Sequence, residues 1–131
     1  MATLAGMVRR IQGFTLIELM VVLAIVALLL SVAAPRYFGA VEQSKEVALK
    51  QNLATMRDAI DKFHADLGVY PDSLDALVEK RYLRAVPVDP ITDDAKNWAI
   101  AAPPEPEKGK VFDVKSGATG TARDGTSFKD W

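Results

Sequence analysis

The sequence predicts an α+β fold, in which a long, bent N-terminal helix packs part of its length on a small antiparallel sheet. Three observations lead to this prediction. An unbroken apolar run extends from Phe14 to Ala34, a stripe with helical spacing extends from Leu49 to Leu67, and two short alternating segments follow within residues 97–116. The chain of 131 residues has room for one small globular domain.

The apolar run organises the rest of the chain. Its 21 residues carry a single charge, on Glu18, and a helix of that length reaches ~31 Å, about the thickness of the hydrocarbon core of a bilayer. We therefore expect the run to span a membrane. A carboxylate inside such a run costs about 2.5 to 3.5 kcal/mol on insertion scales and is usually retained for a function.

Glu18 has a candidate partner at the start of the run. It lies four residues after Phe14, about one helical turn from the backbone nitrogen of that residue. A cut between Gly13 and Phe14 would turn this nitrogen into a cationic amine. The carboxylate is then neutralised by the amine of its own chain or by that of a neighbouring copy.

The residues around this position resemble a known processing signal. Residues 9–13 read RRIQG and residues 14–22 read FTLIELMVV, which resembles the class III signal of type IV pilins and type II secretion pseudopilins. In that family a membrane peptidase cuts after the glycine and N-methylates the new first residue. The resemblance therefore implies cleavage after Gly13, methylation of Phe14, a role for Glu18 in assembly, and a pilin fold. An ordinary signal peptide is disfavoured because the charge lies inside the apolar run and no Ala-x-Ala site follows it.

We expect three parts in the chain: a prepilin leader (1–13), a transmembrane assembly helix (14–35) and a periplasmic head (36–131). The head is then divided into a helix (36–67), a helix and loop (68–95), and the small sheet with the C-terminal loop (96–131). Arg9 and Arg10 place the leader in the cytoplasm by the positive-inside rule. The protein is therefore expected to cross the bacterial inner membrane once, with its head in the periplasm.

Pro35 follows the apolar run. Its ring clashes with the carbonyl of Ser31 in a helix, so a kink or a loosened turn is expected there. Pilins carry a helix-softening proline at the corresponding place, and the resemblance implies that this segment can unwind when subunits assemble. A functional hinge and a harmless bend are both open at this point.

Beyond Pro35 the helix is expected to continue with one apolar stripe. The stripe residues are spaced 4, 3, 4, 3 and 4 apart: Leu49, Leu53, Met56, Ile60, Phe63 and Leu67. Charged pairs four residues apart, Arg57 with Asp61 and Asp58 with Lys62, indicate a solvated opposite face. A coiled coil is the alternative, but packing on a sheet is favoured because strand-like sequence follows.

The long helix is predicted to end at Gly68, which is a natural C-terminal cap. Asp72 is then placed to cap a short helix from Ser73 to roughly Lys80. Residues 70–90 resemble the segment that joins helix and sheet in major pseudopilins. The sequence departs from that family at Ile91-Thr92, where Trp-Gly usually follows.

Two strands are predicted in the last third of the chain. They cover Asn97 to Ala101 and Lys110 to Ser116, with an exposed loop rich in proline and acid between them. A third short strand is expected near Thr126 to Phe128. Two strands alone are marginally stable, so we expect them to pack on the apolar stripe of the helix.

Composition excludes several classes of function. With 16 basic and 17 acidic residues the formal net charge is −1, which provides no basic face for nucleic acid. The chain has no cysteine for a disulfide, and its one histidine, His64, is expected to be an ordinary helix residue. Because it has no phosphate-binding loop, nucleophile elbow or His-Glu-x-x-His motif, we do not expect an enzyme.

The C-terminal loop contains the one candidate ion site. Ser116, Asp124 and Asp130, together with backbone carbonyls, offer the hard oxygens that Ca²⁺ prefers. Major pseudopilins bind calcium in the loop after the second strand, so the resemblance also points to this ion. Their loop is longer and more acidic, and this chain has Thr119-Gly120 where they often have an aspartate before a glycine.

The resemblance implies a structural role, closest in kind to the major pseudopilins of type II secretion systems. Such subunits form a homopolymeric helical filament, and their partners are the lipid bilayer, prepilin peptidase, minor pseudopilins and an inner-membrane assembly platform. The alternatives are a type IV pilin of a surface pilus, used for adhesion or motility, and a membrane-tethered module that does not polymerise. The missing cysteines and the segment over residues 70–90 favour the secretion filament.

Overall fold

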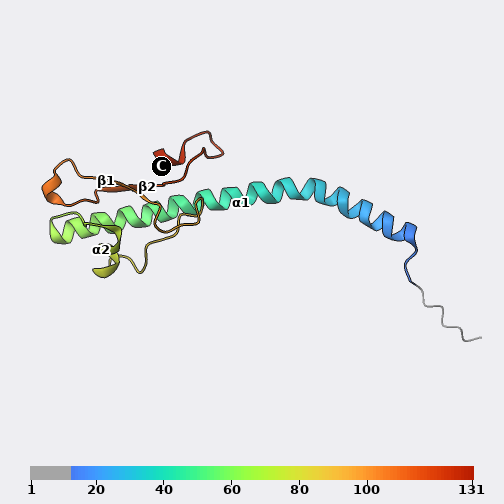
Figure 1. Ribbon diagram of the computed structural model, residues 1–131, viewed down its shortest axis with the longest axis horizontal. Helices are drawn as coiled ribbons and strands as arrows, with labels where there is room; N and C mark the ends of the chain where they lie inside the picture. The colour runs from blue at the N-terminus through green and yellow to red at the C-terminus, as the bar shows by residue number, and fades with distance from the viewer. Residues whose placement is uncertain (1–12) are drawn as a thin grey trace, which may run out of the picture. The chain divides into compact units, whose positions relative to one another are not determined.

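The computed structural model of the protein describes residues 13–131, so the basic part of the predicted leader lies outside the described residues (Figure 1). The elements are α1 (Leu16–Leu67), α2 (Leu74–Glu79), β1 (Ala99–Ala101), η2 (Pro106–Lys108), β2 (Asp113–Lys115) and η3 (Phe128–Asp130). The chain divides into two compact units, of which the first ends at Gly39 and the second, the head, covers Ala40–Trp131. The long helix and the two-stranded antiparallel sheet confirm the predicted α+β class.

Helix α1 begins two residues later than the apolar run, at Leu16. Thr15 is its N-cap, because its hydroxyl accepts a hydrogen bond from the backbone N–H of Glu18 at 3.2 Å and its carbonyl accepts one from Leu19 at 3.1 Å. The helix ends as predicted at Gly68, which adopts a φ of 74° and donates to the carbonyl of His64.

Pro35 lies inside α1, and the helix continues through it. Proline lacks the N–H that would bond to Ser31, but the loss of one bond does not end this helix. The hydroxyl of Ser31 donates to the carbonyl of Leu28 at 2.6 Å. The kink and its role in assembly stay predictions.

The core of the head forms on the predicted stripe of α1. Leu49, Leu53, Met56, Ile60 and Phe63 are buried, and they pack in one cluster with residues of the rest of the head: Leu77, Leu83, Trp98, Val111, Val114, Ala118, Ala122 and Phe128. Figure 1 shows the two strands on one side of this part of α1 and α2 on the other. The stripe ends one turn earlier than predicted, because Leu67 is 50% exposed.

The sheet is shorter than the sequence predicts. Strands β1 and β2 pair over three residues each, with Ile100 opposite Val114. The N–H groups of Lys110 and Val111 both donate to the carbonyl of Pro71, so these residues pair with the end of the α1–α2 connection instead of extending β2. At the other end Gly117 lies so close to the carbonyl of Asn97 that no side chain fits there.

The predicted third strand is wrong. Thr121 and Ser127 form a single antiparallel bridge, and the chain then turns into η3 at Phe128. Phe128 is buried in the core, which a 3₁₀ turn achieves without a further ladder. The loop predicted between the strands likewise contains η2.

Helix α2 is capped by Ser73 and not by Asp72, because the Ser73 hydroxyl accepts from the N–H of Ala76 at 3.2 Å. Its other end is a Schellman motif. The N–H of Tyr82 bonds to the carbonyl of Leu77 and that of Arg81 to Val78, and Arg81 has a φ of 66°. Glycine usually occupies that position, so an arginine there carries backbone strain.

Candidate functional site

The N-terminal half of α1 is an apolar surface that the described chain leaves uncovered. Every residue from Gly13 to Ala33 is exposed, including Phe14 at 86% and Leu29 at 63%. Within residues 13–131, α1 is the one helix long and apolar enough to cross a membrane, with a mean hydropathy of 2.9 over its most apolar window. Such a surface needs lipid or other protein around it.

Gly13 and Phe14 form an accessible peptide bond just before the helix. Both residues precede the first helical residue and are exposed. A side chain added at Gly13 would meet nothing within 4 Å, and its backbone does not require glycine. Within residues 13–131 the fold therefore gives no reason for a glycine at this position.

Glu18 lies in the first turn of α1, three residues after the N-cap Thr15. The positive end of the helix dipole favours a carboxylate at this place. The ion pairs within residues 13–131 do not include Glu18, so its charge has no cationic partner in that part of the chain. It borders an open groove lined by Phe14, Ile17, Val21 and Val22.

Thr15 was missed in the sequence, although its spacing to Glu18 carries a signal. A threonine three residues before a glutamate is the pattern of a capping box, in which the hydroxyl accepts from the N–H of the third helical residue. The sequence had suggested only a role for Glu18 with an amine. The geometry adds that its backbone is fixed by Thr15, which holds the carboxylate at the helix start.

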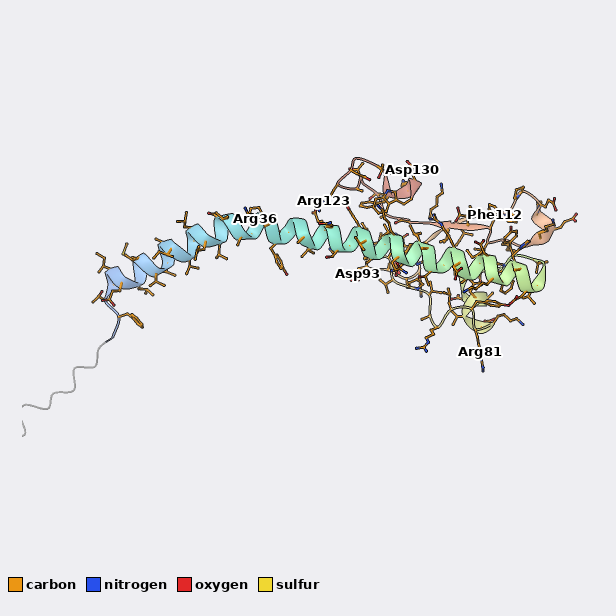
Figure 2. All side chains as sticks on the ribbon, turned by 180° about the vertical axis from the view of Figure 1, so that it is seen from behind. Arg36, Arg81, Asp93, Phe112, Arg123 and Asp130 are labelled. Atoms are coloured by element: carbon orange, nitrogen blue, oxygen red, sulfur yellow. The ribbon has the colours of Figure 1, made fainter. Side chains whose placement is uncertain are left out.

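The three residues predicted for calcium do not form one ligand set. Ser116 is 1% exposed, and its hydroxyl donates to Asp89 at 2.6 Å while accepting from the N–H of Ala118. Asp124 and Asp130 are exposed, and Figure 2 labels Asp130, the last residue of η3. In the described part of the chain no hydrogen bond joins the three, and no group of three or more His, Cys, Asp or Glu side chains could hold a metal ion. These residues do not fit a bound calcium ion.

Asp124 instead organises its own turn. Its carboxylate accepts hydrogen bonds from the hydroxyl and the backbone N–H of Thr126, at 2.6 Å and 3.0 Å. These two bonds lower the pKa of the Asp124 carboxyl below its ordinary value of 3.8. One of its two carboxylate oxygens, Oδ1, is therefore engaged in a local turn.

Asp89 is the buried acid that the sequence analysis missed. It is fully buried, and one carboxylate oxygen accepts from the N–H of Ile91 at 2.9 Å while the other accepts from Ser116. Hydrogen bonds of this kind compensate for the burial of a charge. The spacing from Asp89 to Ile91 is that of an Asx turn, a signal that was present in the sequence.

The C-terminal segment is joined to α1 by polar contacts. Arg57 bonds through Nε to Asp113 at 3.0 Å, and its Nη2 donates to the carbonyls of Val114 and Trp131 at 2.9 Å and 2.8 Å. The predicted pairing of Arg57 with Asp61 is wrong, because β2 brings a carboxylate within reach. The predicted pair of Asp58 with Lys62 is confirmed at 2.9 Å.

A second polar contact lies nearer the start of the head. Glu46 accepts from the backbone N–H of Arg123 at 2.8 Å, and the guanidinium of Arg123 donates to Gln43 at 3.4 Å. Figure 2 shows Arg123 in the loop that lies along α1. Lys50 lies over the ring of Trp131 at 4.6 Å from its centre. These contacts hold a segment with little regular structure.

Comparisons with known proteins agree with the features of the N-terminal half. The family model of the prokaryotic N-terminal methylation motif matches residues 8–34. Core protein G of the type II secretion system of Pseudomonas aeruginosa is 35% identical over 98 residues, which cover 63% of this chain and 69% of that protein. The same protein of Aeromonas hydrophila is 32% identical, covering 63% of this chain and 68% of that protein.

A fimbrial protein is also among the relatives. Fimbrial protein EcpC of Eikenella corrodens is 31% identical over 132 residues, covering 92% of this chain and 82% of that protein. No solved structure matches the chain significantly. The chain therefore belongs to the superfamily of type IV pilins and type II secretion pseudopilins, in which it is similar to core protein G of several type II secretion systems.

Proposed function

We propose that this protein is the major pseudopilin of a type II secretion system, a structural subunit that polymerises into a periplasmic filament for protein secretion. Its precursor is cut between Gly13 and Phe14 by prepilin peptidase and methylated on Phe14. The observation that carries the proposal is the uncovered apolar half of α1, which lies within the match to the methylation motif over residues 8–34. The role is mechanical, and no catalytic step by this chain is part of it.

The exposed apolar side chains favour two environments over water, namely the membrane and the filament. Burying an apolar side chain of this size stabilises by about 1.5 to 3 kcal/mol, so leaving the whole segment in water is strongly unfavourable. In the membrane the bilayer covers it, and in the filament helices of neighbouring copies replace the lipid. Replacing lipid by neighbouring helices costs little free energy, because helices that pack closely regain the contacts that lipid had made.

Glu18 makes the filament more favourable than the lipid. Its carboxylate stands near the start of α1 without a cationic partner among residues 13–131, and cleavage supplies a new amine on Phe14 of each copy. We assign the amine of a neighbouring subunit as its partner. Pairing the two charges in an apolar surrounding removes the penalty of burying either one alone.

The proposed topology follows the charges at the two ends of the span. Arg9 and Arg10 remain in the cytoplasm, residues 14–35 cross the inner membrane, and residues 36–131 form the periplasmic head. The assembly platform and minor pseudopilins of the same system are the expected partners of the subunit. Pro35 is the proposed place where the helix adapts as it leaves the membrane.

Processing is tested on the purified native protein by mass spectrometry of its first residue. We expect a chain that begins at Phe14 and carries one methyl group. Gly13→Val should keep the leader attached, and the head should melt at the wild-type temperature because a side chain at this position meets nothing in the fold. A native chain that still carries its leader contradicts the proposal.

Assembly is tested with Glu18→Gln, which removes the charge but keeps the shape of the side chain. We expect loss of filaments in a reconstituted secretion system, with normal processing and an unchanged melting temperature of the head. Glu42→Gln, on the exposed face of α1 in the head, is the matched control and should assemble. Wild-type filaments from Glu18→Gln would rule out the charge pairing and favour a different seam between helices.

A surface pilin is the second candidate, favoured by the similarity to fimbrial protein EcpC over most of the chain. The two functions differ in what is lost when the chromosomal copy is deleted. A pseudopilin deletion abolishes export of secreted enzymes, whereas a pilin deletion abolishes surface fibres with export intact. Electron microscopy and an assay of secreted proteins on the same strain separate the two.

A further inference from the structure

Three bulky or charged residues follow Pro35, just after the apolar run. Arg36, Tyr37 and Phe38 are consecutive on α1 and all exposed, with Tyr37 at 66% and Phe38 at 64%. The two rings contact each other edge to face, with centroids 5.8 Å apart. Figure 2 labels Arg36 on α1. Two adjacent exposed aromatic rings in water are unfavourable, so a cover from outside residues 13–131 is expected.

Their distance from the apolar run defines what that cover is. The run ends at Ala34, and four residues of helix rise only ~6 Å, so Arg36 to Phe38 lie within one turn of the hydrocarbon edge. The layer at this depth contains phosphate, glycerol and the upper acyl chains. Tyrosine is enriched there because its ring is apolar and its hydroxyl is polar.

The charge of Arg36 also fits the phosphate layer. Arg36 and Glu18 are the two charges between Phe14 and Phe38, one near each end of the segment. The ion pairs within residues 13–131 do not include Arg36. A guanidinium binds phosphate oxygens with two parallel hydrogen bonds, and its aliphatic stem lies well against acyl chains.

We propose that Arg36, Tyr37 and Phe38 form an interfacial anchor that binds the phosphate layer of the periplasmic leaflet and sets the depth of the subunit before it enters the filament. The proposal rests on the proposed membrane span. Tyr37 and Phe38 occupy the boundary between acyl chains and headgroups, and Arg36 binds lipid phosphate. A second copy of the chain as the cover of the rings is the competing occupant.

The absence of cysteine makes the depth measurable with single-cysteine labels. The processed full-length chain is reconstituted in vesicles of phosphatidylethanolamine and phosphatidylglycerol, with an environment-sensitive fluorophore at Leu23→Cys, Ala33→Cys, Ala40→Cys or Ser44→Cys. Aqueous iodide and a lipid-bound nitroxide are the two quenchers. We expect lipid quenching at 23 and 33, water quenching at 44, and the crossover between 33 and 40.

The double variant Tyr37→Ser/Phe38→Ser tests the anchor. We expect the label at Ala33 to move towards water, so that the crossover shifts by about one helical turn, roughly 5 Å. Val47→Ser, which changes an exposed apolar residue of α1 in the head, is the control and should leave the crossover in place. An unshifted crossover in the double variant overturns the proposal.

Two further arms separate the remaining explanations. Arg36→Gln should shift the crossover in phospholipid but not in vesicles of a galactolipid that lacks phosphate, and equal shifts in both lipids overturn the assignment to phosphate. If the label at residue 40 is protected from iodide, and this protection is lost when the protein is diluted in lipid, a second copy of the chain covers the rings. That result also overturns the proposal. Water quenching at Leu23→Cys would instead contradict the membrane span, and so the proposed function itself.

Discussion

Both halves of α1 carry large apolar side chains, but the burial of these side chains is opposite. In the head half the apolar residues fall on one stripe, and Leu53 is 1% exposed beneath the sheet and loops. In the N-terminal half they surround the helix, and Leu29 is 63% exposed. The head thus covers its own stripe, while the N-terminal half depends on lipid or other copies. Stability of the head and stability of the assembly are therefore separate properties of one helix.

The halves also differ in their polar contacts. The head has two strands of three residues and no disulfide, so side-chain contacts from α1 have to hold the loops. Arg57 and Glu46 each reach residues more than 50 positions away in the chain. The N-terminal half instead carries one charge near each end, Glu18 and Arg36. Neither of these two charges belongs to an ion pair within residues 13–131, so both can bind partners outside that part of the chain.

The largest effect is expected from the same substitution made in each half. Leu53→Ala leaves a cavity in the core and should lower the free energy of unfolding of the head by about 2 to 5 kcal/mol. Leu29→Ala should change it by less than about 0.5 kcal/mol, because that side chain is exposed. Near-ultraviolet circular dichroism of the full chain in detergent, during denaturant unfolding, measures both. Equal losses in the two variants would show that the halves unfold as one unit.

A smaller effect is expected from the polar contacts of the head. Arg57→Met removes the bonds to Asp113, Val114 and Trp131 and should lower the free energy of unfolding by about 1 to 3 kcal/mol. Arg84→Met is the control, since Arg84 is exposed and residues 13–131 provide it with no hydrogen bond or ion pair. Denaturant unfolding checks both variants. Equal effects would mean that Arg57 contributes only its hydrophobic stem.

The halves differ, finally, in how much of them the sequence reveals. The apolar run, the stripe from Leu49 to Phe63 and the cap at Gly68 depend on neighbours within a few residues, and periodicity predicts them well. The partner of Arg57 lies 56 residues away, and local spacing favoured the wrong one. The partner of Ser116 lies 27 residues away, and no local spacing indicates it. The proposed site at Gly13, Phe14 and Glu18 is a linear motif, which is why the sequence alone suggests it.

The short strands show the same limit. Alternation predicted five to seven residues for each, but hydrogen bonds from Lys110 and Val111 go to Pro71, a pairing that no local pattern indicates. The residues predicted for calcium show the same limit. Ser116 is bound to Asp89, which lies 27 residues earlier in the chain, a contact that no local pattern indicates.

The strained end of α2 offers a gain in stability that is confined to the head. Arg81 has a φ of 66°, a conformation that glycine adopts without penalty, so Arg81→Gly should raise the free energy of unfolding by about 0.5 to 1 kcal/mol. Arg84→Gly, which removes the same charge, should lower it or leave it unchanged. Thermal melting of the two variants checks the sign. A loss at Arg81 would mean that its side chain contributes more than its backbone strain removes.

The smallest effect is a dependence on pH that also belongs to the head alone. Hydrogen bonds from Thr126 lower the pKa of Asp124 below 3.8, so its carboxylate stabilises the folded head above that pH and loses this contribution as the pH falls through the lowered value. Asp124→Asn removes the titrating group. The difference in melting temperature between wild type and Asp124→Asn should therefore be constant near neutral pH and shrink in acid, from roughly pH 4 downwards. A difference that stays constant into acid would show that the turn is held by the backbone and not by the charge of Asp124.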